Sequence, residues 1–251
     1  MRVRLIPLVL IVLAAAVSAA GQTPSAPAAP APPPPPLTGS IGAGLALTSG
    51  NTDTSTFNLT FNATYDPKSR NVVKAEGLLL RGTSNGVTNV DRTTLQGSDQ
   101  YKLTERSYVF GQLQFLHDRF KDISYLLAPS AGVGYKLVDT PVTTLSTDAG
   151  IGGVWEKDTG LDVNASGAVI ANQKLTHKIS ASATLNEAVS ALWKTGDFGD
   201  ALYTFGAGLT LGVTTRLQFK IELLDTYKNK PPSPTIQKND VATVLALVYK
   251  F

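Results

Sequence analysis

The sequence predicts an all-β protein, a transmembrane antiparallel up-and-down β-barrel of about twelve strands preceded by a disordered Pro-rich segment. Three observations lead to this prediction. Polar and apolar residues alternate in many separate stretches, which is the period of a strand with one apolar face. The first twenty residues have the composition of an export signal. The last eleven residues, VATVLALVYKF, alternate in the same way up to the aromatic Phe251.

Residues 1–20 predict a secretory signal peptide. Arg2 and Arg4 precede an apolar run from Leu5 to Ala16, and small residues follow as a cleavage site. The run is shorter than the ~20 residues that a spanning helix needs, which argues against an N-terminal anchor. Cleavage would remove both arginines, so the 22 basic residues become 20 against 19 acidic ones, a net charge of +1. With no basic stripe either, we expect no nucleic-acid partner.

Residues 21–36, GQTPSAPAAPAPPPPP, predict a disordered Pro/Ala-rich linker. Proline fixes φ and removes backbone donors, so this segment should be an extended spacer without a core of its own. The chain contains no cysteine, so neither a lipid-anchored cysteine nor a disulfide holds the exported protein.

Residues 37–251 predict the barrel. The clearest strand is TSTFNLTFNATY, 54–65, in which the odd-numbered positions from Phe57 onward are apolar and the even-numbered ones are Thr or Asn. Weaker stretches bring the number of candidate strands to twelve, an even number as in bacterial single-chain barrels. Three of them alternate poorly, so ten strands is the alternative. The candidates are centred near residues 44, 59, 76, 97, 111, 131, 148, 169, 184, 207, 221 and 246.

Three features indicate that the apolar face contacts lipid and not a second sheet. Charged residues occur at mid-strand on the polar face, as a wet lumen would allow. A signal peptide delivers the chain across the inner membrane. Aromatic residues gather at the ends of the apolar stripes, as the interface girdles of membrane barrels do. These aromatic residues are Tyr65, Tyr101, Tyr125, Tyr135, Tyr249 and Phe251.

The connections predict an orientation. If both termini face the periplasm, the periplasmic turns are short, and the opposite loops, such as 193–201, are mostly longer and more charged. We therefore expect a multi-pass protein of the outer membrane, in contact with membrane lipid and lipopolysaccharide. The turns expected on the periplasmic side are 66–71, 102–106, 138–142, 174–178 and 213–216.

The final strand predicts how the barrel closes. Alternation from Val241 to Phe251 should pair this strand with the first one, expected at 40–48. Tyr249 and the terminal Phe251 resemble the signal that the barrel assembly machinery recognises, so we expect that machinery as a partner. The even-numbered residues from 242 to 248 are apolar as well, which departs locally from a polar lumen.

No catalytic, cofactor or metal site is predicted, and the protein is not expected to be an enzyme. His117 and Asp118 stand where an outside loop should begin, but His177 lies in a turn on the other side. No Ser–His–acid set or ligand cluster can be assembled around either histidine. Asp118 is expected to form an ion pair with Arg119 at the rim.

Three stretches carry a family resemblance. LTSGNTDTSTFNLTFNATYD, HDRFKDISYLLAPSAGVGYKLVDT and the closing LVYKF are similar to the salt-induced outer membrane protein family, a domain of unknown function (number 481). The resemblance covers 37–251 and implies a Gram-negative outer-membrane barrel. It brings no activity or catalytic residue, and salt induction comes from the family label alone.

Charged and amide residues on the polar face lead to two hypotheses. As the lining of a porin-like passive channel they would hydrate ions or small polar solutes, and their balanced charges argue against strong ion selectivity. As a plug they would pair across the barrel and leave a closed structural or envelope-stress barrel. The candidates are Lys74, Glu76, Arg92, Gln96, Lys102, Asp148, Lys220 and Glu222.

Overall fold

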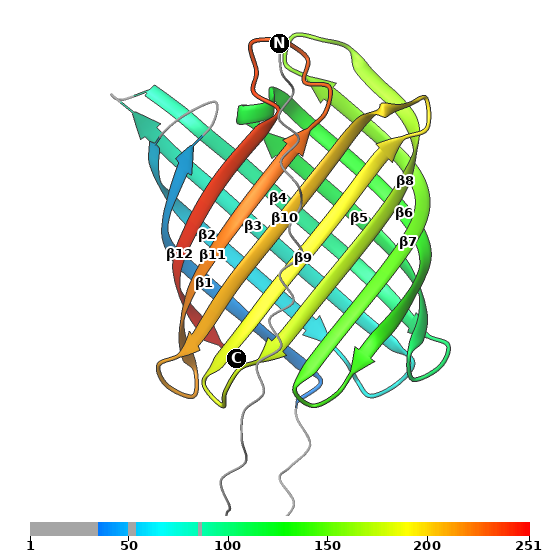
Figure 1. Ribbon diagram of the computed structural model, residues 1–251, viewed down its shortest axis with the longest axis vertical. Coiled ribbons are helices and arrows are strands. Elements are labelled where there is room, and N and C mark those ends of the chain that lie inside the picture. Colours follow the sequence, from blue (N-terminus) through cyan, green and yellow to red (C-terminus); the bar gives the residue numbers. More distant parts are fainter. Residues whose placement is uncertain (1–34, 50–53, 85–86) are drawn as a thin grey trace, which may run out of the picture. The chain divides into compact units, whose positions relative to one another are not determined.

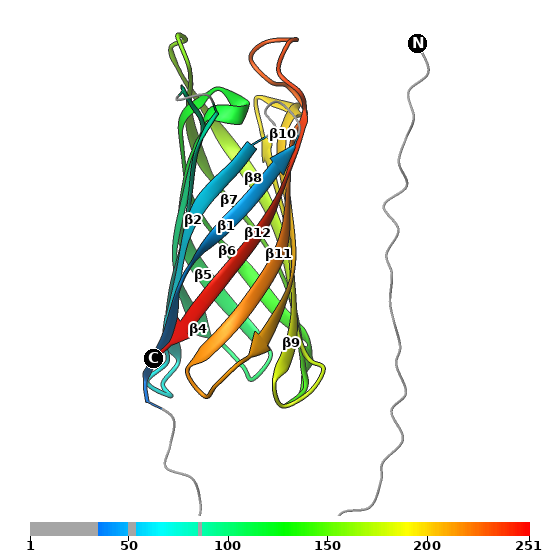
Figure 2. The same cartoon turned by 90° about the vertical axis from the view of Figure 1, so that its left-hand side faces the viewer.

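The computed structural model describes residues 35–49, 54–84 and 87–251, which form a closed antiparallel barrel of twelve strands with one 3-10 turn (Figures 1 and 2). The predicted signal peptide and all but the last two residues of the predicted linker lie outside the described residues. The elements are β1 (Leu37–Ser49), β2 (Thr54–Tyr65), β3 (Asn71–Ser84), β4 (Val87–Lys102), β5 (Ser107–Asp118), η1 (Arg119–Lys121), β6 (Ile123–Asp139), β7 (Thr143–Asp158), β8 (Val163–Lys178), β9 (Ala183–Lys194), β10 (Asp197–Gly212), β11 (Leu217–Lys228) and β12 (Asn239–Lys250).

The predicted strand count is confirmed. Each of the twelve predicted centres falls within a separate strand, so the alternative of ten strands is wrong. Consecutive strands pair with each other, and β1 pairs with β12 to close the sheet. The strands have 12 to 17 residues, more than the roughly 9–11 that a tilted strand needs to cross the hydrocarbon core.

Alternation sends odd-numbered residues outward along much of the wall. The apolar side chains of Leu45 and Ile151 are 59% and 72% exposed, whereas the inward Asn58 and Val244 are 0% exposed. Such a broad exposed apolar surface is favourable against lipid and unfavourable in water. No helix in the described part of the chain is long and apolar enough to cross a membrane.

The connections differ between the two ends of the barrel. We call the end with residues 66–70, 103–106, 140–142, 179–182 and 213–216 the turn end, and the opposite end, with η1, the loop end. In Figure 1 the labelled C-terminus lies at the turn end. Among the connections that the structure describes in full, 229–238 between β11 and β12 is the longest at the loop end.

Two predicted connections are wrong. Residues 174–178, expected as a turn, belong to β8, because this strand keeps its pairing with β7 as far as His177 opposite Thr143. The turn follows at 179–182, which were expected to begin a strand. Residues 193–201, expected as a long loop, leave only 195–196 outside strands β9 and β10.

Exposed aromatic residues mark both ends of the outward face. At the turn end these are Tyr65, Tyr101, Tyr135, Tyr249 and Phe251, as predicted. Tyr125, at the start of β6, lies instead at the loop end. At this end Trp193 Nε1 donates a hydrogen bond of 2.9 Å to Tyr203 Oη, and the ring centroids of Tyr203 and Tyr227 lie 6.0 Å apart. The sequence did not single out this second group.

The seam between β1 and β12 is tightly packed. Gly39 and Phe251 exchange two backbone hydrogen bonds of 3.1 Å, although Phe251 follows the last residue of β12. A Cβ atom on Gly39 would lie 2.7 Å from the Phe251 ring. A Cβ atom on Gly44 would lie 1.7 Å from the Leu245 carbonyl oxygen, so only glycine permits this approach.

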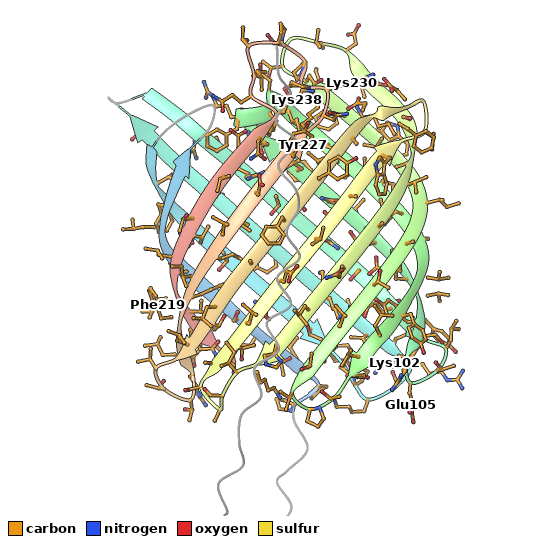
Figure 3. The ribbon with its side chains drawn as sticks, viewed as in Figure 1. Lys102, Glu105, Phe219, Tyr227, Lys230 and Lys238 are labelled. Atoms are coloured by element: carbon orange, nitrogen blue, oxygen red, sulfur yellow. The ribbon has the colours of Figure 1, made fainter. Side chains whose placement is uncertain are left out.

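The assembly role expected for Phe251 from the sequence can be tested by substitution. Phe251→Ala is expected to refold normally in detergent, because the ring is 51% exposed, but to reach the membrane in several-fold lower amount. The measurement is the heat-modifiable band on a gel, compared between membranes and refolded protein. Phe219→Ala, which removes another outward aromatic ring (39% exposed; Figure 3), is the control and should show neither defect. Equal losses in cells and in detergent would assign Phe251 to packing alone.

Candidate functional site: the barrel lumen

A cavity of about 690 Å³ occupies the interior from the turn end to the level of the Arg92 side chain. It begins at the rim near Thr38 and Lys250 and reaches Arg92 and Thr226. Many of its lining residues have hydroxyl or amide groups that both donate and accept hydrogen bonds, which suits water and polar solutes. The hydroxyl and amide residues that line it are Thr38, Ser40, Thr60, Asn62, Thr94, Gln96, Gln112, Gln114, Asn172, Thr184, Asn186, Ser190, Thr204, Thr210, Gln218 and Thr226.

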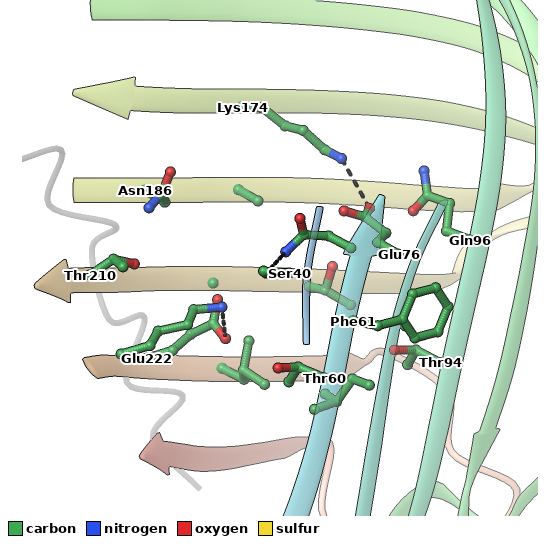
Figure 4. A pocket seen from close by; sticks show the side chains of 18 of the residues that line it. Ser40, Thr60, Phe61, Glu76, Thr94, Gln96, Lys174, Asn186, Thr210 and Glu222 are labelled. Carbon is green, nitrogen blue, oxygen red and sulfur yellow. Dashed lines mark hydrogen bonds and ion pairs between the residues drawn. The ribbon is translucent and has the colours of Figure 1, made fainter. Parts of the chain in front are cut away.

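An ion pair crosses this part of the lumen. Lys174 Nζ on β8 lies 3.1 Å from Glu76 Oε1 on β3, and both side chains are 50% exposed (Figure 4). Four strands separate β3 from β8 on the shorter way around the barrel, so the pair joins opposite walls. The barrel is flattened, broad in Figure 1 and narrow in Figure 2, which brings such walls within reach of each other.

Two further groups of charges lie nearby. Lys220 and Glu222, two residues apart on β11, form an ion pair of 2.8 Å. A smaller space of about 50 Å³ lies on the other side of the crossing pair and is lined by Lys74 and Asp148. The Asp148 carboxylate accepts a hydrogen bond of 2.6 Å from Asn172 Nδ2. In these two spaces Lys74, Lys174 and Lys220 face Glu76, Asp148 and Glu222, and the larger cavity is also lined by Arg92, Asp225 and Lys250.

At the loop end, η1 folds over the interior. Lys121, 0% exposed, lies 2.8 Å from the Asp240 carboxylate and donates hydrogen bonds to the carbonyl oxygens of Gln237 (3.1 Å) and Lys238 (2.7 Å). Burial lowers the pKa of the Lys121 ammonium, and the Asp240 carboxylate opposes that shift. Asp118 caps η1 by accepting a hydrogen bond from the Phe120 amide. These contacts fasten η1 to the β11–β12 loop.

Asp118 and Arg92 close the lumen below η1. They form a buried ion pair of 2.8 Å, and Arg92 also donates to the Thr226 hydroxyl on the opposite wall. The expected pairing of Asp118 with Arg119 is therefore wrong; the inward direction of the side chain selects Arg92 instead. His117 points outward by alternation, and its Nδ1 lies 2.9 Å from the Ser124 carbonyl oxygen.

A third charged group fills the rest of the loop end. Glu156 lies 2.5 Å from Lys194 and in closer contact with Lys228. Asp200 (2.5 Å from Lys194) and Asp158 (3.3 Å from Lys228) complete the network. Buried apolar side chains also occupy this end, so the interior is densely packed in the part of the chain that the structure describes. These side chains include Leu80, Leu116, Phe120, Ile123, Leu126, Val154, Ile170, Leu192, Leu202 and Val244.

The structure brings most of the predicted lumen residues together. Glu76, Gln96, Lys220 and Glu222 line the larger cavity, with Arg92 at its inner end, and Lys74 and Asp148 line the smaller one. Lys102 lines neither of them. It lies at the turn end, 3.4 Å from Asp66 (Figure 3). Partial burial raises the pKa of the Asp66 carboxyl. Hydrogen bonds from Lys68 and the charge of Lys102 outweigh this effect and hold the pKa below its usual value.

Sequence reasoning missed Lys174, because the segment 174–178 was read as a turn. The signal was present: Asn172, Lys174 and Thr176 alternate with Leu175 and Ala171 in the pattern of a strand. The loop-end network was not predicted either, because its charged residues lie in segments expected to be outer loops. In the described part of the chain, no three His, Asp or Glu side chains gather closely enough to hold a metal ion.

Comparison with known proteins places this geometry among barrels of the outer membrane. The NanC porin superposes on this chain with a TM-score of 0.57 at 10% sequence identity. The superposition covers 84% of this chain and 100% of the porin chain. The COG4313 outer membrane channel from Pseudomonas putida F1 superposes with a TM-score of 0.51 at 12% sequence identity, and the superposition covers 87% of this chain and 96% of that channel. At these identities the likeness concerns the fold alone.

Sequence comparison gives the family. The uncharacterized protein YdiY of Escherichia coli K12 is 23% identical over 213 residues, 84% of this chain and 82% of that protein. The model of a protein family of unknown function, DUF481, matches residues 41–251, nearly the whole described barrel. The chain therefore belongs to the DUF481 family, as the resemblance in its sequence predicted.

Proposed function

We propose that the protein is an outer-membrane barrel that conducts ions or small polar solutes passively and is gated at its loop end. The observation that carries this proposal is the cavity of about 690 Å³ with its hydroxyl, amide and paired charged lining. A purely structural barrel would gain more stability from an apolar interior, because buried polar groups need partners. Its fold, which it has in common with an outer-membrane channel, supports the same proposal.

In this proposal the turn end faces the periplasm and the loop end faces outward. Short periplasmic turns and longer outer loops are the usual asymmetry of these barrels. Solutes would enter the cavity at the turn end and pass only when the Lys121 and Glu156 contacts open. Outer-membrane lipid and lipopolysaccharide would surround the apolar belt, and the barrel assembly machinery would insert the chain.

One observation favours the second candidate, a closed structural or envelope-stress barrel. Among the described residues, interior side chains such as Leu80, Val154 and Val244 are 0% exposed, which is expected where side chains fill the lumen. A closed barrel would keep the cavity as a blind vestibule.

Single-channel recording in planar bilayers distinguishes the two candidates. We expect discrete steps from the refolded protein, and larger steps from Lys220→Ala/Glu222→Ala, because two long side chains leave the cavity without changing its net charge. Ile221→Ala, between them but outward and 41% exposed, should leave the step size unchanged. Silence from protein shown to be inserted would reject the channel in favour of the closed barrel.

A further inference from the structure

The pair Glu76–Lys174 differs from the other ion pairs between non-adjacent strands in how easily it can open. Both side chains are half exposed, whereas Glu156 and Lys228 at the loop end are each 3% exposed. A solvated pair contributes about 0–1 kcal/mol, so a ligand can separate it at little cost. A buried pair resists separation because each charge would be left without solvent.

The charges of Glu76 and Lys174 decide which ligand can bind between them and replace their contact with each other. A lone cation could bind Glu76 but would leave Lys174 without a counter-charge, and a lone anion would do the reverse. The surrounding charges do not help either: Lys220 and Glu222 already pair at 2.8 Å, and Lys74 and Asp148, which line the smaller space, have opposite charges that balance each other. A ligand with net charge would therefore leave one uncompensated charge in the lumen, which is unfavourable.

We propose that Glu76 and Lys174 form a binding site for small zwitterions, molecules with one cationic and one anionic group a few ångströms apart. The ammonium of the ligand would pair with Glu76 and its carboxylate with Lys174. Gln96 and Asn172, which line the spaces on both sides, offer amide donors and acceptors for the rest of the ligand. Binding would thus replace the ion pair between Glu76 and Lys174 with two ion pairs between these residues and the ligand, without changing the net charge of the lumen.

The site spans the lumen, so it also acts on passage. Because Glu76 and Lys174 join opposite walls, a solute that passes this level must go around the pair or separate it. Zwitterions separate it without penalty, and simple ions do not. This selectivity rests on the proposed channel, but binding at the pair does not.

Binding to the refolded protein in detergent tests the proposal without requiring conduction. The probes are β-alanine (zwitterion), propylamine (cation), propionate (anion) and 1,3-propanediol (neutral), followed by saturation-transfer NMR and calorimetry. We expect β-alanine to bind at least tenfold more tightly than each of the others. Binding of β-alanine that is absent, or no tighter than that of the other probes, would overturn the proposal.

Substitutions assign the effect to the pair. Glu76→Gln should shift the preference toward propionate, and Lys174→Gln toward propylamine, since each leaves one charge unpaired. The double variant should lose the preference, and the control Lys220→Gln/Glu222→Gln should keep it. The heat-modifiable gel band verifies folding of every variant. A preference for β-alanine that survives in the folded double variant would overturn the assignment, whereas silence in bilayers beside intact binding would reject only the channel.

Discussion

Replacing Glu156 by glutamine is expected to lower the free energy of unfolding of the barrel by about 3–5 kcal/mol, the cost of breaking a buried ion pair from one side. The Glu156 carboxylate compensates both Lys194 and Lys228, and all three side chains are at most 8% exposed. Glutamine keeps the shape but removes the charge. Asp200 and Asp158 remain beside the two ammonium groups, one carboxylate for each, but their side chains are 19% and 20% exposed, so the most buried contacts of the network are lost.

Equilibrium urea unfolding in lipid vesicles, followed by tryptophan fluorescence, measures this effect. Asp139→Asn is the matched control, because its pair with Lys136 is also short (2.7 Å) but about one-third exposed. We expect the control to cost less than about 1 kcal/mol, as solvated pairs do. Similar losses in the two variants would show that the loop-end network is solvated and does not close the lumen.

Replacing Lys121 by methionine is expected to open the loop end. Methionine keeps most of the side-chain volume but cannot pair with Asp240 or donate to the two carbonyl groups at 237 and 238. The cap of η1 at Asp118 stays, so the turn itself persists while its attachment to the β11–β12 loop is lost. We expect the open probability in planar bilayers to rise at least tenfold.

The control for this gating effect is Lys230→Met. Lys230 also lies at the loop end (Figure 3), but its pair with Asp197 is exposed, with side-chain exposures of 55% and 51%. The control should conduct like the unsubstituted protein. Hydrogen exchange of the backbone amides at 119–122 is a second measurement, and this exchange should be faster in Lys121→Met but not in the control. Unchanged conductance with accelerated exchange would mean that η1 is not the gate.

The period of the strands explains why so much of the barrel could be predicted. In a wall with lipid on one side and a polar lumen on the other, each residue must suit its medium, so Phe57, Leu59 and Phe61 alternate with Asn58 and Thr60 as the structure requires. Strand ends could not be predicted as well. Beyond the hydrocarbon core both faces are polar, and nothing in the pattern marks where pairing stops, so the turn after β8 was placed at 174–178 instead of 179–182.

The lumen could be predicted only in part, for a different reason. Alternation identifies which side chains point inward, and this suffices for Glu76, Lys220 and Glu222. It does not give the strand tilt and flattening that bring β3 within reach of β8. Ion-pair partners such as Lys174 for Glu76, or Asp118 for Arg92, depend on how the barrel closes in three dimensions and not on residues adjacent in the sequence.

The seam between β1 and β12 also bears on the order of folding events. Ile41 and Tyr249 are paired in the closed sheet although they lie near opposite limits of the described chain, so this contact has the largest loop-closure entropy to overcome. Hairpins between consecutive strands can form early, because their contacts are local. The open sheet would then carry two unpaired edges until Gly44 lets the Leu245 backbone approach. Closure of this seam is thus expected to be the slow step of folding, and the interval before it the period when the chain is most exposed to aggregation.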